Sequence, residues 1–427
     1  MRAMARFSIR RRHGCGGLVK APMTDRTFDI VLFGATGFTG RLVAEYLAHH
    51  APADVKIALA GRNTPKLEGV RAGLPERAKS WPLVVADAAD PASLAKLAEQ
   101  TRVVCTTVGP YAKYGLPLVE ACAKAGTNYC DLTGETQFMR DSIDRHHETA
   151  KASGARIVHT CGFDSIPSDF GVLTLHEALG ALKRVTYVVE ILKGGFSGGT
   201  IASALNGIDE GKADHARRRM MADPYALSPD RAQEPKLGKE YDLMSFRFDD
   251  FVGQWIAPFV MASVNTRVVR RTNALLGYAY GKQFQYAEVT GMKKGPAAAV
   301  KAAVFTAGLG AFMGSLLFGP TRKLVEGRLP KPGEGPDEKT RKSGFLRVRV
   351  MGESESGTRK SVLIEGKGDP GYQLTAVLLG ESALCLARDE AKLPKVSGVL
   401  TPATAMGKVL RERLVAAGLV FKLEDAV

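Results

Sequence analysis

Phe28-Asp-Ile-Val-Leu-Phe-Gly-Ala-Thr-Gly-Phe-Thr-Gly40 decides the fold of this 427-residue chain. A short apolar strand runs directly into three glycines, and apolar residues at helical spacing follow them. This strand–turn–helix order is the context that a dinucleotide-binding glycine loop requires. Such glycines permit a tight turn, the close approach of a pyrophosphate, and close packing of the helix on the strand. We therefore predict a cofactor site at the helix N-terminus, formed by Gly34, Thr36, Gly37, Phe38, Thr39 and Gly40.

The end of the second predicted strand indicates which nicotinamide cofactor binds. An NAD site usually carries Asp or Glu there to hold the ribose 2′-hydroxyl, whereas this chain has Gly61 and Arg62. A carboxylate would repel a 2′-phosphate, and a guanidinium can bind it bidentately. Together with the G-x-x-G-x-x-G spacing, Arg62 predicts NADP; the alternative is a solvated loop arginine. Asp87, after the third strand, either contacts the adenine or caps the next helix.

Strand and helix patterns alternate from Phe28 to about Thr160, which predicts a parallel, doubly wound sheet covered on both faces. We expect strands at 28–33, 55–60, 82–86, 102–108, 127–131 and 155–160, and helices at 38–49, 64–73, 91–99, 115–125 and 137–153. Ligands of such sheets bind beyond the carboxyl ends of the strands. The loops that follow the last three strands are therefore candidate site segments: 108–115, 130–135 and 161–171.

From about Leu173 the pattern changes. An alternating strand is expected at 183–192, and a charged linker rich in Pro and Gly covers 327–343. A hairpin follows, with strands at 346–350 and 361–364. The last expected elements are helices around 371–388 and 403–417.

Composition narrows the class of protein. The formal net charge is +15, but no compact basic module with interleaved aromatic residues appears, so we expect no nucleic-acid partner. The 6 cysteines form no C-x-x-C pair, which favours reduced thiols in a cytoplasmic protein, and no metal-ligand cluster is visible. The Arg-rich residues 1–26 are interpreted as a disordered tail or an over-long start; a transit peptide is the alternative.

The combined motifs resemble those of the saccharopine dehydrogenase-like oxidoreductases, and most closely their mycobacterial trans-acting enoyl reductase branch. The segments that carry the resemblance are Gly34–Gly40, Gly61-Arg62, Gly109-Pro-Tyr111, Tyr129–Glu135, Cys161–Asp169 and Gly398–Met406. The resemblance implies an N-terminal NADP-binding Rossmann domain, for which we expect residues 27–165. It also implies a second α/β domain with a mixed sheet, over 166–395, and a final helix in 396–427 that returns to the Rossmann domain.

The resemblance also implies a substrate class. Enoyl reductases of this branch reduce double bonds in polyketide-derived lipid chains, with an acyl carrier or polyketide synthase as partner. Saccharopine enzymes instead act on an imine between lysine and a dicarboxylic acid, which requires arginines that clamp carboxylates. No such clamp is identified here; Arg267, Arg270 and Arg271 are candidates, but they lie in a stretch interpreted as a basic face. A lipid or acyl-chain substrate is therefore expected.

Other classes stay open. Short-chain or extended-type dehydrogenases also open with Gly-Ala-Thr-Gly, but they need a Tyr-x-x-x-Lys pair. The match here, Tyr278 to Lys282, lies outside the Rossmann unit and contains Gly281. A non-catalytic NADPH-binding sensor or scaffold would transfer nothing, and a homodimer is kept as an open alternative for the assembly.

The nicotinamide is expected at the ends of the fourth and fifth strands, beside Gly109. Candidate proton donors to the substrate are Tyr111, Asp164 and Ser165. Each has a structural alternative, since Tyr111 can pack under its loop and the other two can cap the following helix. Three further polar residues are interpreted as structural: Asp131 and Glu135 as fixing their own loop, and His159 as a core histidine.

Residues 302–319 form a charge-free run of 18 residues between basic flanks. As a helix this run would measure roughly 27 Å, close to the thickness of a bilayer core. Three interpretations stay open: a core helix, an interfacial anchor or lipid-chain groove, and a membrane span. The second interpretation predicts a cytoplasmic protein held peripherally at the plasma membrane.

Overall fold

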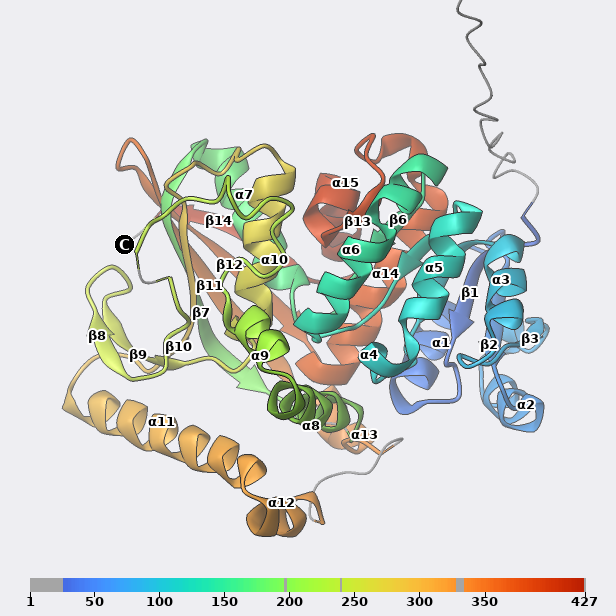
Figure 1. Ribbon diagram of the computed structural model, residues 1–427, viewed down its shortest axis with the longest axis horizontal. Coiled ribbons are helices and arrows are strands. Elements are labelled where there is room, and N and C mark those ends of the chain that lie inside the picture. Colours follow the sequence, from blue (N-terminus) through green and yellow to red (C-terminus); the bar gives the residue numbers. More distant parts are fainter. Residues whose placement is uncertain (1–25, 196–197, 239, 328–333, 426–427) are drawn as a thin grey trace, which may run out of the picture.

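The computed structural model describes residues 26–195, 198–238, 240–327 and 334–425. Figure 1 shows two sheets beside each other, each covered by helices, with two further helices along one edge of the molecule. The five cysteines among the described residues are all buried and free. Residues 1–26 lie almost wholly outside the described part of the chain.

The first sheet is parallel throughout, in the order β13-β6-β5-β4-β1-β2-β3. Its strands are β1 (Phe28–Phe33), β2 (Ile57–Gly61), β3 (Leu83–Val85), β4 (Thr101–Thr106), β5 (Asn128–Cys130), β6 (Arg156–Val158) and β13 (Gly398–Leu400). The predicted doubly wound sheet is therefore confirmed. The chain reverses its direction of travel across the sheet between β1 and β4, and this switch point is where such sheets bind ligands.

Helices cover both faces of this sheet. They are α1 (Phe38–His50), α2 (Thr64–Ala72), α3 (Pro91–Gln100), α4 (Tyr111–Tyr114), α5 (Leu116–Ala125) and α6 (Thr136–Ser153). A further covering helix comes from the C-terminal half: α14 (Thr375–Arg388) packs on α1, β4 and β5 and is buried along almost its whole length.

The second sheet is mixed, in the order β14-β12-β11-β7-β10-β9-β8. Its strands are β7 (Leu182–Lys193), β8 (Arg247–Asp249), β9 (Gln254–Pro258), β10 (Gln285–Gly291), β11 (Phe345–Ser354), β12 (Arg359–Lys367) and β14 (Val420–Asp425). Only β7 and β10 pair in parallel. The predicted strand at 183–192 and the predicted hairpin are confirmed as β7, β11 and β12.

Three helices join the two sheets: α7 (Ile166–Leu179), α10 (Ala262–Leu275) and α15 (Pro402–Ala416). α7 packs against β11, β12, α10 and α15, so it lies at the centre of the contact between the two halves. The last segment of the chain holds more than the expected helix. β13 adds a strand to the first sheet beside β6, α15 follows, and β14 pairs with β12 in the second sheet.

The apolar run forms α11 (Pro296–Leu317), followed by α12 (Gly319–Glu326). Figure 1 shows α11 lying along the edge of the molecule below β8 and β9. Only Ala298, Ala302 and Leu316 are buried, so the core-helix interpretation is wrong. Among the described residues α11 alone is long and apolar enough to cross a membrane by length and composition, and 11% of its apolar window is buried.

The remaining described helices between β7 and β11 are α8 (Gly198–Ala213), α9 (His215–Ala222) and α13 (Glu338–Lys342).

Candidate cofactor and catalytic site

The glycine loop between β1 and α1 leaves no room for side chains at two of its glycines. Gly34 has a φ of +90°, and a Cβ there would lie 2.8 Å from Cγ2 of Val108 and 2.9 Å from Oγ1 of Thr107. A Cβ at Gly40 would overlap the carbonyl oxygen of Gly34. Gly37 is the N-cap of α1, and no side chain at this position bonds the first N–H groups of the helix, which stay available to a ligand. A glycine turn without side chains, followed by an uncapped helix N-terminus, fits the diphosphate of a dinucleotide. Of the other predicted residues, Thr36 lies in this turn, and Phe38 and Thr39 are the first two residues of α1.

The next two strand ends hold the residues predicted to recognise the adenosine. Arg62 directly follows β2, is exposed, and makes no hydrogen bond or ion pair with any described residue. Asp87 follows β3, which neighbours β2, and accepts a hydrogen bond from the N–H of Ala89 at 3.0 Å. The N-cap of α3 is Asp90. The capping alternative for Asp87 is therefore wrong, and its contact with adenine stays a prediction.

Glu135 fixes the loop that follows β4, at the predicted nicotinamide end of the site. Its two carboxylate oxygens accept hydrogen bonds from the N–H groups of Tyr111 and Ala112, both at 2.9 Å. Ser203 of α8 donates a third, at 2.8 Å. Burial raises the pKa of Glu135, and these hydrogen bonds oppose that shift. Glu135 thus ties the loop at Gly109 to α8, a contact that sequence reasoning missed.

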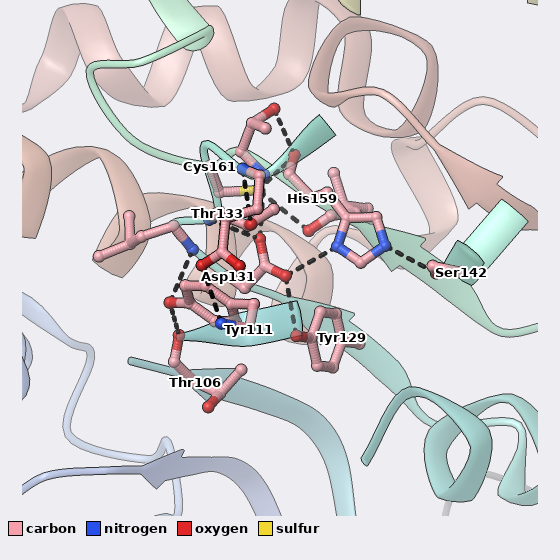
Figure 2. A network of polar contacts seen from close by, with 12 residues as sticks. Thr106, Tyr111, Tyr129, Asp131, Thr133, Ser142, His159 and Cys161 are labelled. Atoms are coloured by element: carbon pink, nitrogen blue, oxygen red, sulfur yellow. Dashed lines mark hydrogen bonds and ion pairs between the residues drawn. The ribbon is translucent and has the colours of Figure 1, made fainter. Parts of the chain in front are cut away.

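Asp131 is the centre of a buried network that joins the ends of β5 and β6. Its carboxylate accepts hydrogen bonds from the hydroxyl of Tyr129 at 2.8 Å and from Nδ1 of His159 at 2.7 Å. The N–H groups of Thr133 and Thr160 donate to its other oxygen at 3.1 and 3.0 Å. Figure 2 shows these groups converging on Asp131.

The network continues from the other side of the imidazole. Nε2 of His159 lies 2.8 Å from Oγ of Ser142, which gives a Ser–His–Asp order. Ser142 and Asp131 are completely buried and His159 is 3% exposed, so no substrate reaches this serine. The arrangement therefore holds loops in place, and His159 is the core histidine that the sequence suggested.

The loop after β6 begins with a strained residue. Thr160 has a φ of +60°, which is rare for a β-branched residue and requires support from its surroundings. That support comes from Asp131, which binds the N–H of Thr160 through its carboxylate and the N–H of Cys161 through its carbonyl at 2.7 Å. Farther on, the N–H of Phe163 donates to Oγ1 of Thr375 on α14 at 3.1 Å. These contacts fix the backbone on both sides of residue 162.

The three candidate proton donors have different surroundings. The hydroxyl of Tyr111 is buried between the carbonyl of Thr106 and the N–H of Leu132, each at 3.3 Å, and burial raises its pKa well above the ordinary value. The hydroxyl of Ser165 is buried and donates to Oδ1 of Asn265 at 3.1 Å. Both groups are thus engaged inside the protein.

Asp164 is partly exposed, and its carboxyl group has no hydrogen-bond or ion-pair partner among the described residues. Burial, and secondly the charge of Asp131, raises the pKa of Asp164 to about 7. A carboxyl group with such a pKa carries its proton in a large share of molecules near neutral pH. Of the three candidates, Asp164 alone is both accessible and free to donate.

The three arginines of α10 are buried, so their interpretation as a solvated basic face is wrong. Arg271 donates to the carbonyls of Leu227 and Val399, both at 2.7 Å, and burial lowers its pKa to about 9. Arg270 donates to the carbonyl oxygen of Tyr286 at 3.0 Å. Arg267 pairs with a carboxylate of the chain itself, that of Asp242. Engaged in this way, none of them is available to clamp a dicarboxylic substrate.

Comparisons with known proteins agree with this site. Residues 30–158 match the family model of the saccharopine dehydrogenase NADP-binding domain. A Mycobacterium tuberculosis protein that provisionally bears the name trans-acting enoyl reductase is 49% identical over 413 residues, which cover 93% of this chain and 97% of that protein. The trans-acting enoyl reductase of Mycobacterium bovis is 44% identical over 412 residues, with the same coverage.

Among solved structures, apo saccharopine dehydrogenase from Saccharomyces cerevisiae aligns with 93% of this chain and 99% of its own, at 11% identity and a TM-score of 0.49, a likeness too low to add to the assignment. The identity to the mycobacterial proteins over 93% of this chain, together with the match to the NADP-binding domain, is sufficient. The chain belongs to the trans-acting enoyl reductases, a branch of the saccharopine dehydrogenase-like, NADP-dependent oxidoreductases.

Proposed function

We propose that the protein reduces the carbon–carbon double bond of an enoyl group on a polyketide-derived chain. NADPH, when bound, supplies the hydride, which adds to the β-carbon of the enoyl group. Asp164 donates the proton that the α-carbon needs, and its carboxylate then recovers a proton from water. The observation that carries this proposal is the free, partly exposed carboxyl group of Asp164, with a pKa of about 7, at the carboxyl end of β6.

The neighbouring residues support this role by fixing the loops. Glu135 holds the turn at Tyr111, and Asp131 holds the turn at Thr160, so both walls of the proposed nicotinamide pocket are anchored to buried carboxylates. A donor fixed in this way can face the reacting carbon without rearrangement. Tyr111 and Ser165 would then act as wall residues that keep water from the pocket.

The substrate and partner follow from the relatives' name. A trans-acting enoyl reductase works on a chain that a separate synthase carries, so we infer a polyketide synthase with its acyl carrier as the partner. The engaged arginines of α10 support an acyl chain over a dicarboxylic amino acid as substrate.

We further propose that α11 holds the protein peripherally at the cytoplasmic face of a membrane. The helix has apolar residues on every side, and Val300, Val304 and Phe312 are between 44% and 67% exposed. A helix that is hydrophobic all round is stable only when something covers it. Lys293 and Lys301 precede the apolar run, and positive charge at this position suits anionic lipid.

Isotope transfer tests the proposed reaction. Purified protein is incubated with NADPH deuterated at the transferable position and a long-chain enoyl pantetheine thioester. The label should appear at the β-carbon of the saturated product. In a parallel reaction with unlabelled NADPH in deuterated water, deuterium should appear at the α-carbon. If NADPH binds but the label reaches no enoyl acceptor, the NADPH-binding sensor or scaffold explains the protein better.

A further inference from the structure

A segment of the C-terminal half lies against the first residue of α1, next to the glycine loop. A Cβ at Gly335 would overlap the ring of Phe38, so the backbone there touches this ring directly. The guanidinium carbon of Arg341, on α13, lies over the same ring, 5.5 Å from its centroid. Tyr372 meets the ring edge-on, with centroids 5.2 Å apart. Phe38 directly follows Gly37, the N-cap of the helix that binds phosphate in this fold.

The backbone around Arg341 is firmly held. Its carbonyl oxygen accepts a hydrogen bond from the N–H of Asp369 at 2.7 Å, and its own Nη1 donates to the carbonyl of Pro336 at 2.8 Å. Oδ2 of Asp369 in turn accepts a hydrogen bond from the N–H of Gly195, two residues after the end of β7. Three separate segments of the second half thus meet beside Phe38.

The charge of Arg341, by contrast, is not paired. Nε of Arg341 is buried without a hydrogen-bond partner, and no carboxylate of the described residues lies within ion-pair distance of the guanidinium. The nearest charges are those of Asp369, Asp337 and Glu338, which interact with Arg341 over a longer distance than an ion pair. Leaving a partly buried guanidinium without a directly bonded anion costs free energy. An anionic ligand at this position would remove that cost.

We propose that Arg341 binds the diphosphate of NADP(H), opposite the N–H groups at the start of α1. The cofactor is then held from both halves of the chain, by the glycine loop on one side and by α13 on the other. The assignment differs from that of Arg62, which is predicted to recognise the 2′-phosphate on the adenosine ribose. Because both NADPH and NADH contain the diphosphate, Arg341 supplies affinity without selecting between them.

Two phosphate-containing fragments separate the two arginines. ADP carries the diphosphate and lacks the 2′-phosphate, whereas 2′-AMP carries only the 2′-phosphate. Dissociation constants of both fragments, and of NADPH and NADH, are measured by titration calorimetry. Replacing Arg341→Ala should weaken ADP, NADPH and NADH by about tenfold or more, the loss expected for one charge-assisted hydrogen bond. The affinity for 2′-AMP should stay unchanged. Replacing Arg62→Ala should give the reverse pattern for the two fragments.

Arg347→Ala is the matched control. Arg347 also lies over a phenylalanine, at 5.7 Å from the ring of Phe345, but it pairs with Glu365 in the second sheet. Its loss should leave all four affinities as they are. If Arg341→Ala does not fold, Arg341→Gln removes the charge and keeps a donor for Pro336. Unchanged ADP binding in a folded Arg341 variant overturns the proposal, and so does an equal loss of ADP and 2′-AMP binding, which would indicate general damage to the site.

Discussion

Asp131 binds Nδ1 of His159 at 2.7 Å, and this buried pair sets both the shape and the electrostatics of the loop that follows β6. Since a carboxylate only accepts, the imidazole donates from Nδ1 to Asp131. The same carboxylate binds the N–H of Thr160 in its strained conformation, and its charge is one of the causes that raise the pKa of Asp164. Asp131 therefore affects the proposed proton donor in two ways: its hydrogen bond fixes the backbone that carries Asp164, and its charge raises the pKa of Asp164.

Replacing Asp131→Asn should move the pH profile of turnover. The variant loses the negative charge that helps Asp164 keep its proton, so the pKa of Asp164 falls, although burial still holds it above the ordinary value. Because the protonated acid is the active form, turnover falls as pH rises through this pKa. The alkaline limb should therefore begin at a lower pH than in the unmodified protein. Steady-state rates between pH 5 and 9 measure the pH at which this limb begins.

Tyr129→Phe is the control for this experiment. It removes one hydrogen bond to Asp131 and keeps the charge. The free energy of unfolding should fall by about 1 kcal/mol, and the alkaline limb should stay where it is. If Asp131→Asn folds and its limb does not move, the charge of Asp131 does not tune the donor.

Asp164→Asn should lower turnover while NADPH binds as before. Loss of a general acid reduces the rate by roughly 10²- to 10⁴-fold, and nothing in the glycine loop depends on this side chain. Tyr111→Phe serves as a comparison, since its hydroxyl bonds only to backbone groups in the described structure, and should cost stability more than rate. Equal rates in the unmodified protein and Asp164→Asn, with substrate saturating, would remove Asp164 from the mechanism.

The same variant should also change how stability depends on pH. The folded pKa of Asp164, about 7, lies above the unfolded value, so this group binds more protons in the folded state between about pH 4 and 7. Its contribution to stability is present at low pH and is lost as pH rises through 7. We therefore compare the free energy of unfolding of Asp164→Asn with that of the unmodified protein. The difference between them should shift in favour of the variant as pH rises from 5 to 8. Urea unfolding at both pH values tests the sign.

The first sheet follows from the sequence because its elements are long and periodic. From β1 to α6, each apolar strand and amphipathic helix carries its own pattern, and the predicted bounds differ from the observed ones by a few residues. β13 was not predicted as a strand, because Gly398–Leu400 is too short to show a period. Its place beside β6 depends on partners more than 200 residues away.

The sequence predicts only those parts of the candidate site whose residues lie close together along the chain. The glycine loop and the proposed role of Arg62 could be inferred from the sequence because each lies in a short stretch directly after one strand. The contacts of Asp131 with His159, of Glu135 with Ser203, and of Phe38 with Arg341 join distant segments and leave no local pattern. The arginines of α10 were misread because charged residues are rarely buried.

Arg62→Ala should weaken NADPH far more than NADH. The exposed guanidinium makes no hydrogen bond or ion pair with the described part of the protein, so its removal breaks no internal polar contact. Losing its charge-assisted contact with the 2′-phosphate should cost about 1.5–3 kcal/mol for NADPH and little for NADH. Titrations of both cofactors against both proteins measure this. Equal affinities of the unmodified protein for NADPH and NADH would contradict the role given to Arg62.

Phe312→Asp combined with Leu317→Asp should release the protein from anionic vesicles. Both side chains are exposed, at 44% and 54%, so charge is tolerated there in the folded protein, whereas Leu316 is buried and would not tolerate it. Sedimentation with phosphatidylglycerol–phosphatidylcholine vesicles should find the unmodified protein in the pellet at low salt. Val85→Asp, at an apolar residue of β3 on the first sheet that is 62% exposed, should leave binding intact. An unmodified protein that stays in the supernatant with these vesicles would show that something other than lipid covers α11.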